Sequence, residues 1–185
     1  RSTLFPYTTL FRSLELGFDF TNSPYDLSQE SLSGRDLVLT TTTGTKLITN
    51  SRQARHVLIG STLNYLAVVN KMVTLGGDWA IIGAGSHGDF RDEDKVGCAL
   101  IANCYLRASC CHTSKELRHF INQYTTNIGD IIQASVSSRK LKSLGRQCDI
   151  DFVIDHTGQY FVVPVLTKSM SDQIAICKNE GGKSA

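Results

Sequence analysis

The chain has 185 residues, of which 41% are hydrophobic and 19% are charged. These values are ordinary for one soluble globular domain with a sizeable core, and they exclude an intrinsically disordered chain. No apolar run approaches the roughly 18 to 20 residues that a membrane-spanning helix needs, and the N-terminus lacks the pattern of a secretory signal. We therefore expect a cytoplasmic protein with no membrane partner.

The first thirteen residues differ in character from the rest of the chain. Residues 3–13 match an in-frame translation of a common sequencing-library adaptor, so we predict that residues 1–13 are an artefact and that the native sequence starts at Leu14. The alternative is a natural edge strand or a short apolar tail. Without Arg1 and Arg12 the 19 basic residues become 17, which equals the 17 acidic residues, and the formal charge falls from +2 to zero. No nucleic-acid partner is expected, because a basic surplus is absent.

Six cysteines are present, and none of them forms a C-x-x-C pair. Without a secretory signal, a disulfide framework is not expected. Cys110, Cys111 and His112 are adjacent and could bind a metal or act in catalysis. The pattern favours incidental thiols at a helix end, because no second ligand pair has the spacing of a zinc site.

Short apolar runs alternate with longer amphipathic segments from residue 36 onward, which is typical of strands that feed crossover helices. The short runs predict strands at residues 36–41, 56–61, 79–84, 150–154 and 160–166. The amphipathic segments predict helices at residues 62–75, 92–107, 114–123 and 128–144. We expect a three-layer α/β fold with a mostly parallel sheet, formed by one domain at residues 14–170 and followed by a tail at residues 171–185.

The stretch at residues 17–33 is rich in turn-forming residues, where a parallel sheet usually has its first strand. The sequence therefore predicts that one or more N-terminal strands of this fold are missing.

A threonine-rich turn, Thr-Thr-Thr-Thr-Gly-Thr at residues 40–45, follows the first predicted strand at the expected start of a helix. Free N–H groups of a first helical turn, surrounded by hydroxyls, suit a phosphate group. Gly44 lets the backbone approach a ligand closely, and Lys46 is near enough in sequence to add positive charge. The alternative is that Thr43 or Thr45 simply caps a helix, and the local sequence favours neither reading.

A second loop, at residues 83–88, matches the dinucleotide-binding pattern G-x-G-x-x-G. Physical chemistry argues against that function, because four carboxylates between Asp89 and Asp94 lie where a pyrophosphate would need a positive helix end. Glu93 and Asp94 fit a magnesium site better, since Mg²⁺ takes one or two carboxylates and keeps waters and phosphate oxygens. Asp19 is a further candidate ligand. The alternative for the acidic residues is that they only complement the helix dipole.

Taken in order, these segments resemble the 2-phosphosulfolactate phosphatase family over nearly all of residues 14–166. The resemblance is carried by a glycine, aspartate and Asn-Ser-Pro motif at residues 17–24, the turn at residues 40–45, Gly60-Ser61 with Asn64, Ala84-Gly85 with Gly88, Glu93-Asp94, and a closing strand at residues 163–166. The N-terminal part of the family, with a strand that ends in an aspartate and an Arg-Ala-Thr-Thr turn, has no counterpart here.

The resemblance implies a magnesium-dependent phosphatase that converts 2-phospho-3-sulfolactate into 3-sulfolactate and phosphate, in coenzyme M biosynthesis or other sulfonate metabolism. It leaves the nucleophile open between activated water and a covalent phosphoenzyme, and it leaves homo-oligomerisation open. We expect the fragment to be inactive or impaired. The competing class is a non-catalytic α/β domain that binds phosphate or sulfonate, and a dinucleotide oxidoreductase is the weaker alternative.

The predicted site residues fall into three groups. The residues expected at the reacting group are Thr41, Thr42, Glu93 and Asp94. The expected magnesium ligands are Asp19, Glu93 and Asp94. The residues expected to bind the rest of the substrate are Asn22, Ser23, Thr40, Gly44, Thr45, Lys46, Ser61, Asn64 and Gly85.

Overall fold

The computed structural model describes residues 3–5, 19–39, 43–85, 88–169 and 175–179. Eight helices and four strands occur within these ranges. The helices are α1 (Pro24–Ser28), α2 (Gly44–Asn50), α3 (Tyr65–Leu75), α4 (Asp92–Ser109), α5 (Lys115–Thr125), α6 (Ile128–Ala134), α7 (Val136–Ser143) and α8 (Gln147–Asp155). The strands are β1 (Thr3–Phe5), β2 (Leu37–Leu39), β3 (Pro164–Ser169) and β4 (Ala175–Asn179).

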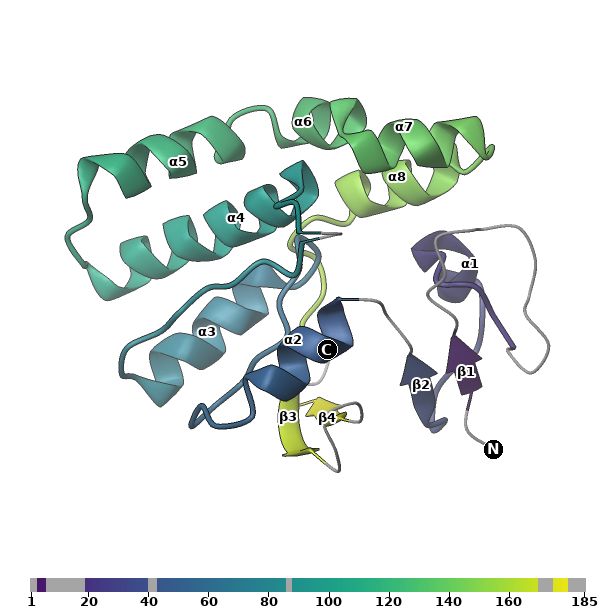
Figure 1. Cartoon of the computed structure of the whole chain (residues 1–185), viewed down its shortest axis with the longest axis horizontal. Coiled ribbons are helices and arrows are strands. Elements are labelled where there is room, and N and C mark those ends of the chain that lie inside the picture. The colour runs from purple at the N-terminus through teal and green to yellow at the C-terminus, as the bar shows by residue number, and fades with distance from the viewer. Residues whose placement is uncertain (1–2, 6–18, 40–42, 86–87, 170–174, 180–185) are drawn as a thin grey trace.

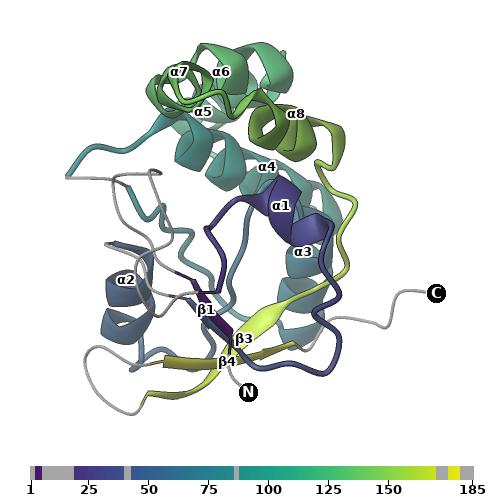
Figure 2. The same cartoon turned by 90° about the vertical axis from the view of Figure 1, so that its right-hand side faces the viewer.

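Helices and strands occupy different sides of the molecule. Helices α4 to α8 form a layer along one side, α3 lies against α4, and the short strands lie on the opposite side with α2 (Figure 1). The view at 90° shows the same separation (Figure 2). Within the described part of the chain, no helix is both long and apolar enough to span a bilayer.

Helix α4 is the centre of the hydrophobic packing. One cluster joins it through Ile101 to α3 and to Val163 and Val165 near β3. A second cluster, on another face, joins it to α6 and α8 and consists of Val96, Leu100, Ile132 and Ile150. Because apolar side chains on two faces of α4 are buried, the helix holds a fixed position between the two halves of the core.

The expected mixture of helices and strands is confirmed, but the three-layer parallel sheet does not appear among the described residues. β1 and β2 form a parallel pair of three residues each. β3 and β4 form an antiparallel pair with an irregularity between Leu166 and Lys168. The predicted strand at residues 56–61 is reduced to one antiparallel bridge, between Leu58 and Val165.

The predicted strand at residues 79–84 has no regular secondary structure. Its apolar side chains remain largely outside the core, since Ile81 is 36% and Ile82 is 61% exposed. A short apolar run forms a strand only where neighbouring strands take up its backbone hydrogen bonds. Those neighbours are absent around this segment in the described structure, and the prediction is wrong there.

The predicted strand at residues 150–154 is also wrong, because this segment lies within helix α8. Ile150 is buried, and Val153 and Ile154 pack against the same cluster, whereas Asp151 and Asp155 are exposed. This is the period of a helix, but a run of five residues does not distinguish it from a strand.

The four predicted helices are present, with one change. The segment at residues 128–144 forms two helices, α6 and α7, that are separated at Ser135. Ser135 has an extended backbone and its side chain caps α7 by accepting a hydrogen bond from the N–H of Ser138 at 3.1 Å. A serine in this position favours a new helix start over a continuous helix.

Candidate active site

The candidate site lies at the N-terminal end of α4. The first turn of this helix follows Arg91 and carries Asp92, Glu93 and Asp94, where the helix dipole favours negative charge. Val96, at the end of this turn, has no exposed surface. The core therefore fixes the start of the helix, and with it the two carboxylates that were predicted to bind magnesium.

Asp94 connects the start of α4 to both predicted ligand-binding loops. The N–H of Gly85 donates to Oδ2 of Asp94 at 3.2 Å, and the hydroxyl of Thr43 donates to the carbonyl oxygen of Gly85 at 2.9 Å. The pKa of Asp94 is raised, first by burial and then by the negative charge of Glu93, while backbone hydrogen bonds from Gly85 and Arg91 oppose this shift. The threonine turn, the glycine loop and the acidic helix start thus meet at one place.

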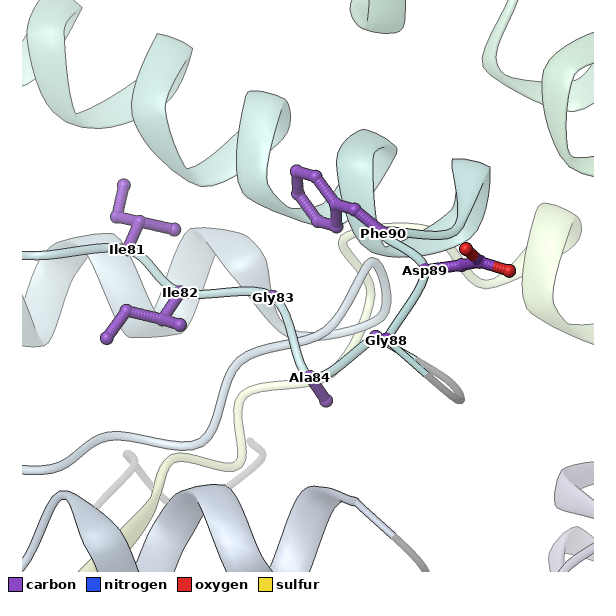
Figure 3. A pocket seen from close by; sticks show the side chains of 8 residues that line it. Ile81, Ile82, Gly83, Ala84, Gly88, Asp89 and Phe90 are labelled. Atoms are coloured by element: carbon purple, nitrogen blue, oxygen red, sulfur yellow. The ribbon is translucent and has the colours of Figure 1, made fainter.

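The glycine loop lines an open hollow of about 400 Å³ (Figure 3). Ile81 and Ile82 point to opposite sides of the loop, and the ring of Phe90 lies against Gly83 (Figure 3). Gly85 has a φ of +64°, and a Cβ atom there would lie 2.9 Å from the carbonyl oxygen of Asp89. Only glycine fits this turn without strain, because both the positive φ and the close backbone approach exclude a side chain.

Glu93 makes a contact that the sequence did not reveal. The hydroxyl of Ser137, on α7, donates a hydrogen bond to Oε1 of Glu93. The second oxygen, Oε2, is buried and has no hydrogen-bond partner among the described residues. A buried carboxylate oxygen without a partner is costly, so this atom is suited to bind a cation or an ordered water.

Ser23, which was predicted to bind substrate, lies in a buried network between α1 and α8. It is 1% exposed and caps α1, with its hydroxyl accepting a hydrogen bond from the N–H of Asp26 at 3.0 Å. The same hydroxyl donates to Oδ1 of Asp149 at 2.5 Å and accepts from Arg146. Arg146 also pairs with Asp26 at 2.7 Å and with Asp149 at 2.9 Å. These residues fasten α1 to α8, while Asn22 beside them is half-buried.

Asn64 is likewise engaged within the protein. Its amide donates to the carbonyl oxygens of Ile59 at 3.1 Å and Val162 at 2.8 Å. Its Oδ1 accepts from the N–H of Ser61 at 2.8 Å and from the Ser61 hydroxyl at 3.2 Å. Both amide protons are therefore used, and Asn64 holds the loop before α3. Ser61 remains exposed on that loop.

The remaining predicted phosphate ligands lie on or near α2. Gly44 begins this helix, Thr45 is half-buried, and Lys46 is exposed to solvent. Thr43 occupies the N-cap position, but its side chain makes no capping hydrogen bond and donates instead to the glycine loop. The predicted residues Thr40, Thr41 and Thr42 lie outside the described residues.

The three predicted magnesium ligands are not gathered into one cluster. Among the described residues, no group of three His, Cys, Asp or Glu side chains is arranged to hold a metal ion. Glu93 and Asp94 stay together because they are neighbours on α4, whereas Asp19 does not complete a group with them. Cys110, Cys111 and His112 likewise form no metal-binding group with other described residues, and both thiols are exposed.

The thiol of Cys98, also on α4, should report on the charge of Asp94. Burial, and after it the negative charge of Asp94, raises the pKa of Cys98 from its ordinary value of 9.0 to about 11. At pH 8 the thiolate is therefore about 100-fold scarcer than for a thiol with the ordinary pKa. We expect iodoacetamide to label exposed Cys110 and Cys111 long before Cys98, as followed by peptide mass spectrometry.

The variant D94N serves as the comparison in the same labelling experiment. Removing the charge of Asp94 lowers the pKa of Cys98, so its labelling at pH 8 should become faster. Labelling of Cys98 at the rate of Cys110 in the unaltered protein would contradict this assignment.

The chain is similar to one known protein family and to several of its members. The sequence profile of 2-phosphosulpholactate phosphatase matches residues 15–169. A probable 2-phosphosulfolactate phosphatase of Clostridium acetobutylicum is 43% identical over 90 residues, which is 49% of this chain and 38% of the relative. Its counterpart from Clostridium novyi is 31% identical over 159 residues, which is 82% of this chain and 67% of the relative. A third, from Caldanaerobacter subterraneus, is 30% identical over 154 residues, covering 81% of this chain and 63% of the relative.

The chain is a mixed α/β protein in which Thr43, the glycine loop and the paired carboxylates of α4 meet at one helix start. The chain belongs to the 2-phosphosulfolactate phosphatase family. The resemblance drawn from the ordered motifs is thus confirmed. The alignments span between 38% and 67% of the length of these relatives.

Proposed function

We propose that the protein is a phosphoric monoester hydrolase that converts 2-phospho-3-sulfolactate into 3-sulfolactate and phosphate with the aid of Mg²⁺. The proposed substrate is the one that the names of the family and of its members give. The observation that carries the proposal is the path of hydrogen bonds from Thr43 through Gly85 to Asp94, which joins the threonine turn to the acidic helix start. The reaction would take place in the cytoplasm and serve coenzyme M biosynthesis or other sulfonate metabolism.

Charge explains why a divalent cation belongs in this proposal. The substrate carries phosphate, carboxylate and sulfonate groups, all of them negative at neutral pH, and Glu93 and Asp94 alone would repel it. Mg²⁺ needs only one or two protein carboxylates, so these two residues suffice, and Asp19 would act through water. The buried, unpartnered Oε2 of Glu93 is an oxygen suited to such an ion. When bound, Mg²⁺ polarises the phosphoryl group and stabilises charge on the leaving oxygen.

The threonine turn would hold the phosphoryl oxygens. Thr40, Thr41 and Thr42 supply hydroxyls, Gly44 and Thr45 supply backbone N–H groups, and exposed Lys46 adds positive charge. During hydrolysis a water oxygen becomes bonded to phosphorus, either directly or after a covalent phosphoenzyme has formed. The bond between phosphorus and the C2 oxygen breaks, and the C2 oxygen takes up a proton that water supplies. Asn22 and Ser61 would donate hydrogen bonds to the carboxylate or sulfonate of the substrate. Ser23 and Asn64 hold the loops on which Asn22 and Ser61 lie.

The chain as printed should turn over little substrate. Several apolar side chains of the described residues are largely exposed, including Leu37 and Leu39 of β2 at 53% each, Ile82 at 61% and Phe161 at 56%. Exposed apolar side chains of this kind favour association with other chains over a rigid site. Activity therefore has to be measured both on the chain as printed and on a version extended to the length of its relatives.

The test is phosphate release from 2-phospho-3-sulfolactate by the family-length protein, with Mg²⁺ and with an excess of EDTA. We expect release that EDTA abolishes and added Mg²⁺ restores. Binding of the ester without any phosphate release would favour the non-catalytic anion-binding domain instead. Equal turnover by the printed chain and the extended protein would contradict the expected impairment.

A further inference from the structure

We infer that Ser137 is a positioning residue for Glu93, because its hydroxyl holds one carboxylate oxygen so that the other one faces the cation. The inference rests on the proposed magnesium site, which it deepens by naming a residue from a separate helix. Ser137 itself touches neither the substrate nor the ion.

The contact joins two elements that lie far apart in the sequence. Ser137 is the second residue of α7, and Glu93 is the second residue of α4. The start of α7 is itself fixed, since Ser135 is 2% exposed and caps the helix through the N–H of Ser138. The hydroxyl of Ser137 is therefore presented to Oε1 of Glu93 from a rigid helix start.

The two carboxylate oxygens of Glu93 differ in their hydrogen bonding. Oε1 accepts the hydrogen bond from Ser137, whereas Oε2 is buried and has no partner in the part of the chain that the structure describes. A glutamate side chain has three rotatable bonds and loses considerable conformational entropy when it is ordered. A hydrogen-bond donor on one oxygen orders the side chain before the ligand binds. It also leaves the other oxygen available for a cation. Partners of this kind commonly change metal affinity 10- to 100-fold when they are removed.

A purely structural link between α4 and α7 is the competing explanation. It predicts that loss of the hydroxyl lowers stability but leaves the affinity of the folded protein for metal unchanged. The positioning role predicts a weaker affinity for metal even where the variant is fully folded. The two explanations therefore differ in a binding constant that can be measured without turnover.

The experiment measures Mn²⁺ binding by electron paramagnetic resonance, and Mg²⁺ binding by calorimetry, on the family-length protein without substrate. The variants are S137A, S137T, which keeps the hydroxyl, and the control S143A. Ser143 ends the same helix, is exposed, and donates to the carbonyl oxygen of Lys140 within its own helix. Thermal unfolding of each variant shows whether it is folded at the temperature of the binding measurement.

We expect the metal dissociation constant to rise about 10-fold in S137A, and to stay within about 3-fold of the unaltered value in S137T and S143A. At saturating Mg²⁺, kcat should recover to within about 3-fold in S137A. An unchanged dissociation constant in folded S137A would overturn the inference. If S137A does not fold, the same comparison is made with S137C, whose thiol is a weak donor, and an unchanged constant there overturns it equally.

Two further results separate this inference from the proposed function. Metal binding that depends on Glu93 and Ser137, in a protein that releases no phosphate, would support the positioning role and contradict the hydrolase. A metal affinity that E93A leaves unchanged would overturn the positioning role, whatever the rate of phosphate release.

Discussion

Replacing Asp149 by alanine is expected to lower the free energy of unfolding by about 3 kcal/mol. Asp149 is 3% exposed, accepts hydrogen bonds from the Ser23 hydroxyl and the N–H of Tyr25, and pairs with Arg146. Without it, two donors and the guanidinium of Arg146 lose their acceptor. This loss of unfolding free energy should lie at the lower end of the range for breaking a buried ion pair, because the Arg146 side chain is still 27% exposed. Urea unfolding followed by circular dichroism measures it.

Two variants on the same helix control this measurement. D151A removes an exposed aspartate whose contact is with Gln147, and it should change the unfolding free energy by less than about 0.5 kcal/mol. D149N keeps the shape and one acceptor oxygen, so its loss should fall between those of D149A and D151A. Equal stability of D149A and D151A would show that this network does not hold α1 against α8.

Replacing Glu93 or Asp94 by alanine should reduce magnesium-dependent phosphate release by the family-length protein about 100-fold or more. Each change removes one carboxylate of the proposed magnesium site. D94A also deprives the N–H of Gly85 of its acceptor, so the glycine loop should lose its fixed position in that variant alone. The measurement is the initial rate of phosphate release over a series of Mg²⁺ concentrations.

The control for this second prediction is D92A. Asp92 lies in the same first turn and carries the same charge, but it pairs with Lys95 at 3.1 Å and its side chain is 43% exposed. If the acidic residues only complement the helix dipole, all three variants should behave alike. We expect D92A to retain activity within about 3-fold. Unchanged release by both E93A and D94A would contradict the magnesium site.

Features that depend on neighbours in the sequence were predictable. The start of α4 follows from three acidic residues before an apolar run, because the dipole and the helical period act within a few residues. The glycine at position 85 was recognisable as a turn residue, and the order of the motifs identified the family. The predicted mixture of helices and strands was correct for the same reason.

Features that depend on distant partners were not predictable. The sequence of residues 150–154 predicts a strand. In the structure this segment is helical, and Ile150 is buried against α4 and α6. The buried network of Ser23 leaves no local signal, because its hydroxyl donates a hydrogen bond to Asp149, 126 residues away. Ser137 carries no local signal at all, because its importance arises only where α7 reaches Glu93.

The sequence by itself determined which residues could carry phosphate chemistry in this protein, namely the threonine turn, the glycine loop and the carboxylates of Glu93 and Asp94. It did so because capping, backbone freedom and charge are properties of short segments. Only the tertiary structure decided which of the predicted polar residues are left for a ligand. Packing of α1 against α8 buries Ser23, and the contact with α7 occupies one oxygen of Glu93, while the other oxygen has no partner within the described ranges. A polar side chain that is hydrogen-bonded inside the protein is less available to a ligand. Which side chains are bonded in this way depends on contacts between residues far apart in the sequence.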